Sequence, residues 1–248
     1  MNFAGTSILV TGAASGIGAA TARHLADHGA GRLILADRDS AGLEKLDLRC
    51  EVRRLAGDVS DPAFWSSAEL GPLDHAVLNA GVPGVGAITD MPFEEWRRVL
   101  AVNLDGVFLS LQAALRAMQD GGSAVIVASA AGLKAEKNIA AYASSKAAVI
   151  QLARVAALEG ADRGIRVNAI APGGVETPIW DGTDWFRALE ARHGREGAYR
   201  AIASEGTPLK RFARPEEIAA QIAFLLSAEV SGYTTGSVLV TDGGYSVS

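Results

Sequence analysis

Cysteine is almost absent from this chain of 248 residues, in which Cys50 is the only one. An internal disulfide framework is therefore excluded, and a reducing compartment, the cytoplasm, is the expected location. Nothing beside Cys50 resembles a site that activates a thiolate, so we interpret it as an ordinary thiol near the edge of a strand.

Long apolar runs and blocks of one charge are missing as well. Met1–Thr11 has no basic segment followed by a long apolar run, so no secretory signal is expected. No stretch reaches the roughly 18 uninterrupted apolar residues of a membrane span. A net charge of -5 without any Lys/Arg block disfavours nucleic acid as a partner. His24 and His28 are four residues apart but lack a third ligand, so no metal site is expected.

What the chain does have is enough apolar sequence for a large core, since 49% of its residues are hydrophobic. Short β-rich apolar runs alternate with longer helical patterns. The expected strands are 7–10, 32–36, 51–55, 76–78, 124–127, 165–169 and 237–240. Such alternation predicts an α/β fold: a doubly wound, Rossmann-type parallel sheet of about seven strands, covered by helices on both faces. We expect residues 1–248 to form a single dinucleotide-binding and catalytic domain, with the polar alternation of 51–55 placing that strand near an edge.

Two helical patterns are long, from Phe93 to about Met118 and from Ile139 to about Ala161. The second is rich in alanine, which suits close packing against another helix as well as against the sheet. The segment 176–212 breaks the alternation and carries Trp180 and Trp185. An insertion of this length in an α/β domain is typical of a substrate lid.

A glycine-rich turn follows the first strand directly and opens a helix. It comprises Thr11-Gly12-Ala13-Ala14-Ser15-Gly16-Ile17-Gly18. Glycines let the backbone approach a pyrophosphate, whose charge sits against the helix N-terminus. The spacing is GxxxGxG and differs from the common GxGxxG fingerprint, so a methyltransferase nucleotide site remains an alternative here.

Asp37 ends the second strand, about twenty residues beyond these glycines, as the fingerprint requires. Its carboxylate can accept hydrogen bonds from the adenosine ribose and would repel a 2′-phosphate, which favours NAD over NADP. The neighbouring Arg38 offsets part of that repulsion.

Tyr142 and Lys146 are four residues apart and therefore share one face of a helix. Ser129 follows the fifth strand, at the carboxyl edge where doubly wound sheets bind their ligands. A nearby ammonium lowers the pKa of a phenol, and a serine hydroxyl can orient a substrate oxygen. Together these groups suit proton transfer beside a hydride acceptor, as alcohol oxidation requires.

With these motifs in order, the whole chain resembles the short-chain dehydrogenase/reductase family. The further matching elements are Asn79-Ala80-Gly81, Asn103 in Val102-Asn103-Leu104, Asp58-Val59, and Pro172-Gly173 followed by Val175 and Thr177. The resemblance implies a general acid/base in Tyr142, a lower pKa of that tyrosine and a ribose contact through Lys146, a substrate-oxygen contact through Ser129, and a proton-relay water fixed by Asn103.

The resemblance also implies the cofactor contacts and the assembly. The implied contacts are Gly12, Ser15, Gly16, Ile17, Gly18, Asp37, Asp58, Val59, Asn79, Ala80, Gly81, Tyr142, Lys146, Pro172, Gly173, Val175 and Thr177. NADP-specific members often carry arginine where this chain has Ser15, which agrees with Asp37. The long helices of such proteins pair across two-fold axes, which implies a homotetramer or a homodimer.

The leading hypothesis is an NAD-dependent dehydrogenase of a polyol, a cyclic alcohol or a hydroxy acid. An NADP-dependent 3-oxoacyl reductase and a dinucleotide-binding sensor without turnover are the alternatives. Lys134, Asn138, Trp180 and Trp185 are candidates for the pocket wall. A lysine there would favour a carboxylate or a polyhydroxylated substrate, although Lys134 and Lys137 could equally point into water.

Overall fold

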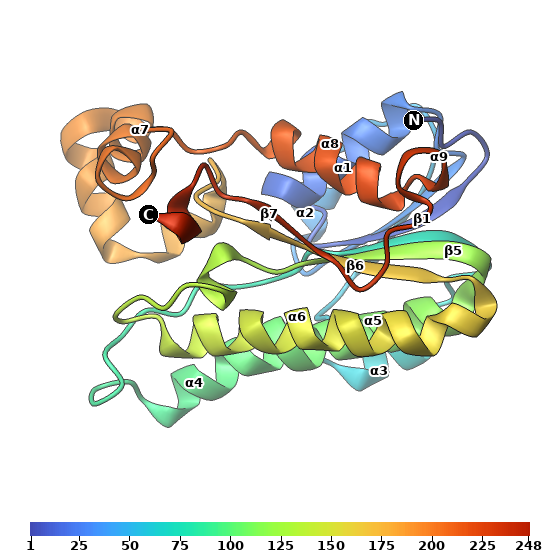
Figure 1. Ribbon diagram of the computed structural model, residues 1–248, viewed down its shortest axis with the longest axis horizontal. Coiled ribbons are helices and arrows are strands. Elements are labelled where there is room, and N and C mark those ends of the chain that lie inside the picture. Colours follow the sequence, from blue (N-terminus) through green and yellow to red (C-terminus); the bar gives the residue numbers. More distant parts are fainter.

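A parallel sheet of seven strands runs through the computed structural model, which describes residues 1–248 (Figure 1). The strands stand in the order β3-β2-β1-β4-β5-β6-β7. Their bounds are β1 Ser7–Thr11, β2 Arg32–Asp37, β3 Glu51–Ala56, β4 Leu73–Leu78, β5 Met118–Val127, β6 Arg166–Pro172 and β7 Val238–Thr241. The predicted doubly wound sheet is confirmed, and β3 lies at an edge, as its polar alternation predicted.

The order of the strands reverses at β1, which pairs with β2 on one side and with β4 on the other. From β1 the chain moves outward to β3 and then crosses back to β4, so the next strands extend the sheet in the opposite direction. Loops that leave the carboxyl ends of β1 and β4 therefore diverge. In doubly wound sheets, this divergence opens the crevice in which ligands bind.

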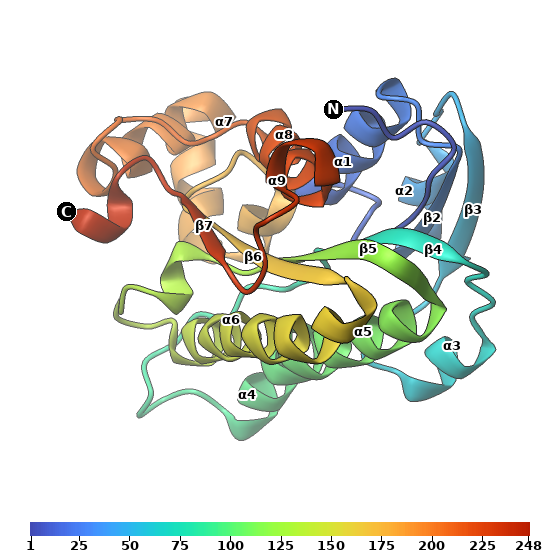
Figure 2. The same ribbon diagram turned by 45° about the vertical axis from the view of Figure 1, so that its right-hand side comes forward.

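Helices cover both faces of the sheet (Figures 1 and 2). One layer contains α1 Gly16–Asp27, α2 Ser40–Glu44, α8 Pro215–Leu226 and α9 Ala228–Ser231, and α1 packs against α8. The other contains α3 Pro62–Ser67, α4 Phe93–Leu100, the π-helical turn η1 Ala101–Asp105, α5 Gly106–Ala117 and α6 Ala140–Gly160. Alternate residues of β1 supply both cores: Ile8 and Val10 face α1, whereas Leu9 faces α5 and α6.

The long helix predicted from Phe93 to Met118 is present as three consecutive segments without a break: α4, the π turn η1 and α5. Phe93–Ala117 is long and apolar enough, by length and composition alone, to cross a membrane. Its buried side chains, among them Val107, Leu111 and Ala114, pack in the core against the sheet. We therefore interpret it as a core helix of this fold.

The two ends of the segment expected to be a lid lie side by side and are joined by backbone hydrogen bonds. Glu176 N donates to Ala213 O at 3.0 Å, and Ala213 N donates to Gly174 O at 2.9 Å. Between these bonds lie the 3-10 turn η4 Pro178–Gly182 and helix α7 Asp184–Gly206, which is kinked where Gly194 adopts φ 69°. A small separate core holds the segment together, with Phe186, Tyr199 and Phe212 buried in it.

The remaining short elements are the 3-10 turns η2 Ala130–Gly132, η3 Ala161–Arg163 and η5 Tyr245–Val247. The last of these brings the C-terminal segment beside the lid (Figure 1).

His75 lies within the central sheet on β4, between Ile8 of β1 and Ser123 of β5. Its Nδ1 is 2.9 Å from the Ser123 hydroxyl, which itself donates to Leu226 O at 2.8 Å. Because that hydroxyl proton is already engaged, the hydroxyl oxygen accepts from Nδ1–H, and this fixes the neutral tautomer. Burial lowers the pKa of His75 from 6.5 to about 4.

Acid should weaken the fold through His75. In the unfolded chain the imidazole is protonated below about pH 6.5, whereas the folded protein resists protonation until about pH 4. The unfolded state therefore binds more protons within this window, and the free energy of unfolding should fall as the pH drops through it. Between pH 7 and 4.5 the loss from this group should be about 2–3 kcal/mol, measured by denaturant unfolding.

His75→Asn separates this group from the other titrating residues, because an amide N–H can replace Nδ1–H without titrating. The variant should lose less stability than the wild type on acidification. His193→Asn, in an exposed part of the lid, is the matched control and should behave as the wild type. The assignment fails if His75→Asn and the wild type show the same pH dependence.

Candidate functional site

The glycine turn between β1 and α1 is shaped by close backbone approaches. Gly12 and Gly16 have φ of 64° and 52°, in the left-handed region that favours glycine. A Cβ on Gly12 would lie 2.8 Å from Ala80 Cα, and one on Gly18 would lie 2.1 Å from Gly12 O. Gly18 lines neither of the two cavities described below, and the structure shows a packing role for it, so its cofactor contact stays a prediction.

Thr11 and Asn79 connect this turn to the end of β4. The Thr11 hydroxyl accepts from the backbone N–H groups of Asn79 and Ala80, at 3.0 and 3.1 Å. The Asn79 Nδ2 donates to Thr11 O and Gly12 O, each at 3.1 Å. The two loops that diverge at the reversal of strand order are therefore held at a fixed separation.

Asp37 faces the glycine turn from the end of β2. Its carboxylate accepts from Ala14 N and from Asp39 N, both at 3.0 Å. Each oxygen keeps a lone pair for a further donor. Asp58, in the turn after β3, accepts from the hydroxyl and the backbone N–H of Ser60 at 2.7 and 2.8 Å, and these bonds lower the pKa of its carboxyl.

A cavity of about 410 Å³ extends from the glycine turn past both carboxylates. The predicted contacts that line it are Gly12, Ser15, Gly16, Ile17, Asp37, Asp58, Val59, Asn79, Ala80, Gly81 and Thr177. Backbone N–H groups at the start of α1 and acceptors at the far end suit a pyrophosphate and an adenosine, respectively. The residues present therefore fit a nicotinamide dinucleotide.

A second cavity, of about 550 Å³, adjoins the first and shares part of its wall. The residues that line both are Ile17, Asn79, Gly81, Pro83, Thr177 and Ile179. The expected residues Ser129, Tyr142, Lys146, Pro172, Gly173 and Val175 line the second cavity. The residues predicted to contact the dinucleotide, except Gly18, thus line two adjoining cavities, with the Ser-Tyr-Lys set in the second.

Ser129, Tyr142 and Lys146 converge because β5 ends opposite the first turns of α6. The Ser129 Oγ accepts from Ala131 N at 3.2 Å, and the Ser129 hydroxyl lies within hydrogen-bonding reach of Tyr142. Lys146 is 3% exposed, and its Nζ donates to Val127 O at 2.9 Å. The same Nζ lies 5.7 Å from the centre of the Tyr142 ring.

The expected fall in the pKa of Tyr142 is not what the structure shows. Burial raises the pKa of Tyr142, and the hydrogen bond from Ser129 opposes only part of that rise. Burial also lowers the pKa of Lys146 to about 8. The positive charge that was expected to stabilise a phenolate is therefore lost at a lower pH than in an exposed lysine. Desolvation therefore decides the direction of both shifts, and the phenol stays protonated at neutral pH.

Asn103 lies in the π turn η1 and is fully buried, but it lines neither cavity. Its Oδ1 accepts from Val82 N at 2.8 Å, and its Nδ2 donates to Val82 O at 3.0 Å and to Ser145 Oγ at 3.3 Å. Through these bonds the side chain fixes the loop that follows Asn79. The role of Asn103 in holding a relay water stays a prediction.

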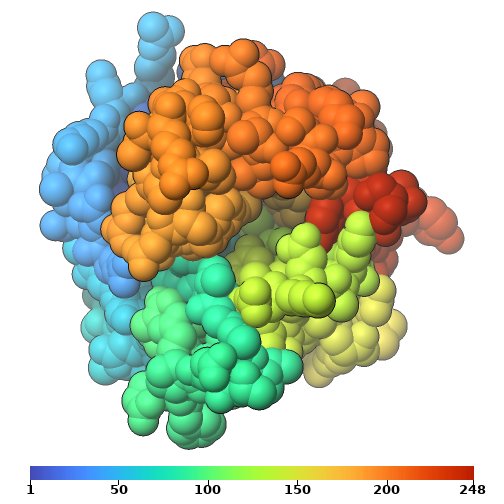
Figure 3. All heavy atoms as spheres, turned by 90° about the vertical axis from the view of Figure 1, so that its left-hand side faces the viewer, coloured from blue at the N-terminus to red at the C-terminus, as the bar shows by residue number.

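The lid forms the wall of the second cavity that faces α6 (Figure 3). Trp180 is fixed there by a bond from its Nε1 to Val175 O at 2.7 Å and by stacking on Phe212 at 5.2 Å between ring centres. Trp180 and Trp185 both line the cavity, and so does Asn138 from the loop before α6. These three predicted wall residues are therefore correctly placed.

Lys134 is placed differently from either alternative that the sequence left open. It lines no cavity, and its Nζ donates to Tyr245 O at 2.8 Å and to Ser248 O at 2.7 Å. The ammonium also lies 4.6 Å from the centre of the Tyr245 ring. Lys134 thus fastens the C-terminal segment, and it gives no indication of substrate charge.

Two residues of the cavity wall, Glu136 and Tyr245, were missed. Glu136 precedes Asn138 in a loop that the sequence did suggest, whereas Tyr245 arrives from the end of the chain. The turn Asp242-Gly243-Gly244 was the available signal, because consecutive glycines mark a sharp change of direction after the last strand. The Asp242 carboxylate accepts from Gly244 N at 2.9 Å and from Ser246 N at 2.7 Å, which aims Tyr245 at the cavity.

Comparison with known proteins gives full-length matches. A family model described as enoyl-(acyl carrier protein) reductase matches residues 12–246. The cis-4-hydroxycyclohexanecarboxylate dehydrogenase of Sinomonas cyclohexanicum is 37% identical over 98% of this chain and 97% of its own length. The galactitol 2-dehydrogenase (L-tagatose-forming) of Cereibacter sphaeroides is 38% identical over 98% of this chain and 96% of its own length.

A solved structure agrees with these relatives. The L-sorbose reductase of Gluconobacter frateurii, complexed with NADPH and L-sorbose, is similar with a TM-score of 0.91 and 28% identity. The match covers 100% of this chain and 99% of that one. The similarity therefore extends over the sheet, both helical layers and the lid.

Proposed function

Because this chain belongs to the short-chain dehydrogenase/reductase family and acts on CH–OH groups with a nicotinamide dinucleotide, we propose that it interconverts a secondary alcohol and its ketone with NAD as the cofactor. One observation carries the proposal: Ser129, Tyr142 and Lys146 line a cavity that continues into the one bordered by Asp37. Proton transfer and hydride transfer must meet at one carbon–oxygen bond, and a continuous hollow permits this.

The chain's own residues manage the substrate oxygen. The Ser129 hydroxyl, which lies beside Tyr142, donates to that oxygen and orients it. Tyr142 gives a proton to the oxygen when a ketone is reduced and takes it back when an alcohol is oxidised. A bound nicotinamide supplies the hydride acceptor or donor at the adjacent carbon. Burial keeps Tyr142 in the protonated form that reduction requires.

Lys146 contributes a positive charge next to the phenol. Its anchorage on Val127 O fixes the ammonium at the carboxyl end of β5. From there it stabilises the phenolate that proton donation leaves behind, without itself giving up a proton. We therefore assign Lys146 an electrostatic role and Tyr142 the acid/base role.

Tyr142→Phe tests the acid/base assignment. The substitution keeps the ring and removes the hydroxyl, so turnover should fall by about 10²–10⁴-fold while dinucleotide affinity stays close to that of the wild type. Nicotinamide absorbance measures turnover, and tryptophan fluorescence titration measures affinity. Tyr233→Phe, which alters a fully exposed tyrosine, is the control. If Tyr142→Phe keeps more than a tenth of the activity, another group transfers the proton.

The preference for NAD rests on Asp37 and Ser15, which line the same cavity. The oxygens of Asp37 have free lone pairs for ribose hydroxyls and would meet the charge of a 2′-phosphate with like charge. Ser15 provides no cation to compensate for that repulsion. Arg38 also borders the cavity, and it is the one nearby cation that favours NADP.

Asp37→Ala combined with Ser15→Arg should move the ratio of catalytic efficiencies toward NADP by about 10²-fold or more, because it removes the repulsion and adds a phosphate partner. Steady-state kinetics with both cofactors give the ratio. Asp47→Ala removes an exposed carboxylate outside both cavities and should leave the ratio unchanged. A wild-type enzyme that already prefers NADP would refute the interpretation of Asp37.

The substrate is proposed to be a small cyclic alcohol, polyol or hydroxy acid. The names of the matched relatives span these three kinds. The cavity supports a small organic molecule, because its wall is largely apolar and aromatic with a few polar groups at the reacting end.

We also propose a homotetramer, with a homodimer as the smaller alternative. Large apolar side chains remain exposed on both helical layers. Phe108 of α5 and Leu158 of α6 are exposed in one layer, and Phe224 of α8 is exposed in the other, with Val240 exposed on the edge strand β7. We assign one subunit interface to each of these two faces. Leu158 is 80% exposed, which is costly for a leucine side chain in water. Two self-complementary surfaces on one chain are what a closed tetramer with crossed two-fold axes requires.

Light scattering of the wild type at micromolar concentration should give about four times the chain mass of 25.7 kDa. Leu158→Glu places a charge on one surface and should reduce the assembly to dimers. Glu159→Gln, next to it, changes charge without creating a buried one and is the control. A monomeric wild type would refute the proposed assembly.

A further inference from the structure

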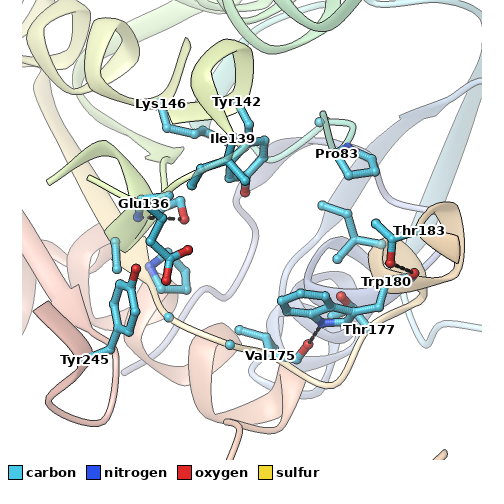
Figure 4. A pocket seen from close by; sticks show the side chains of 18 of the residues that line it. Pro83, Glu136, Ile139, Tyr142, Lys146, Val175, Thr177, Trp180, Thr183 and Tyr245 are labelled. Carbon is cyan, nitrogen blue, oxygen red and sulfur yellow. Dashed lines mark hydrogen bonds between the residues drawn. The ribbon is translucent and has the colours of Figure 1, made fainter. Parts of the chain in front are cut away.

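Glu136 and Tyr245 form a polar pair on one side of the substrate cavity. Figure 4 shows both side chains opposite Trp180 and Thr183, with Tyr142 between the two sides. The cavity therefore presents the reacting oxygen site, an indole wall, and a second polar region away from the reacting end. The established chemistry of the site uses neither member of this pair.

Tyr245 is held firmly in place. Lys134 binds its carbonyl oxygen at 2.8 Å and lies 4.6 Å from its ring centre, and Asp242 caps the turn that precedes it. Leu209 N donates to Gly243 O at 3.1 Å, which joins this turn to the base of the lid. The ring is thus fixed between the loop before α6 and the lid.

The Tyr245 hydroxyl is buried and makes no hydrogen bond of ordinary geometry, although the Glu136 carboxylate lies beside it and interacts with its proton. Burial, this interaction with Glu136 and the negative charge of Asp242 raise the pKa of Tyr245, so the phenol keeps its proton and remains a donor. A buried donor with so poor a bond gains from a ligand that offers a well-placed acceptor. Glu136 beside it is exposed and offers only acceptors.

A group that satisfies both residues must accept from Tyr245 and donate to Glu136. An alcohol hydroxyl does both at once. A carboxylate can accept from Tyr245 but is repelled by Glu136, and a methyl group does neither. Lys137 also borders the cavity, but as an exposed side chain its charge is screened by solvent. The ammonium of Lys134 is engaged by carbonyl oxygens of the C-terminal segment.

We propose that Glu136 and Tyr245 bind a second hydroxyl group of the substrate, so that the enzyme selects uncharged diols and polyols over hydroxy acids and simple alcohols. This inference rests on the proposed alcohol oxidation. It names the class of substrate within that reaction, and it makes Glu136 a specificity-determining residue whose carboxylate is positioned by the wall that Tyr245 forms.

The test compares three cyclic probes that differ at one substituent: cyclohexanol, the cyclohexanediols and 4-hydroxycyclohexanecarboxylate. The wild type should oxidise the best diol with a kcat/KM at least about tenfold above that of the other two, because each additional hydrogen bond of this kind is worth about one power of ten. Glu136→Gln and Tyr245→Phe should each cut the advantage of the diol over cyclohexanol by about tenfold, mainly through KM.

The controls separate specificity from damage to the fold. Cyclohexanol, which has no second hydroxyl, is the reference substrate for each variant, so that a general loss of activity cancels from the diol-to-cyclohexanol ratio. Glu136→Gln should improve the hydroxy acid relative to the diol. Glu94→Gln alters an exposed carboxylate outside both cavities and should change none of these ratios.

Two results overturn the inference while leaving the proposed function intact. One is a wild type that prefers the hydroxy acid or cyclohexanol. The other is an equal loss on diol and cyclohexanol in Glu136→Gln. A folded wild type that oxidises no alcohol and reduces no ketone with either cofactor would instead overturn the proposed function itself.

Discussion

The hydrogen bonds between Thr11 and the Asn79–Ala80 backbone hold together the point where the sheet reverses its strand order. Every other feature of the site is positioned relative to this junction. It sets the distance from the glycine turn to the loop after β4, and the Gly12 turn is so close to that loop that no Cβ fits between them. Because Asn79 and Gly81 border both cavities, the same junction aligns the dinucleotide cavity with the substrate cavity.

The burial of the Lys146 charge is the second constraint, and it accounts for the π turn η1 between α4 and α5. Lys146 must be desolvated to lie beside Tyr142, and only one backbone carbonyl, that of Val127, accepts from its ammonium. The loop after β4 must exclude water from Lys146 and therefore needs a fixed conformation. Asn103 provides it by hydrogen bonds to both the backbone N–H and the backbone C=O of Val82. The π turn has one more residue per turn than an α-helix, which rotates Asn103 inward from a helix that otherwise packs through apolar side chains.

The sequence predicted the parts of this protein that depend on local pattern. Strand runs such as 32–36 and the glycine turn are contiguous, so hydrophobic period and turn chemistry suffice to place them. The tyrosine–lysine pair follows from helical spacing alone. The π turn could not be predicted, because Ala101–Asp105 has an ordinary helical composition and the partner of Asn103 in that turn, Val82, is 21 residues away in the sequence.

Quantities that depend on the balance of opposing terms were also out of reach. The pKa of Tyr142 was expected to fall because a lysine is close in sequence, yet burial, which depends on the whole fold, decides its direction. The packing role of Gly18 and the contacts of Lys134 could not be predicted for the same reason, since their neighbours, Gly12 O and the C-terminal carbonyls, come close only in three dimensions. The cytoplasmic location stays a prediction, because it is not a property of the folded chain.

Reaction and substrate choice are supplied by different parts of the fold. The sheet edge and the first turns of α6 carry the groups that act on any carbon–oxygen bond, and they are rigid because they belong to the core. The distal wall of the cavity is built from the loop before α6, the lid and the C-terminal segment. Lys134 and Leu209 join these three pieces to one another without involving the sheet. A substitution in this outer assembly can therefore reshape the pocket while Tyr142 and Lys146 keep their geometry. For this reason short sequence motifs predict the class of reaction but not the substrate.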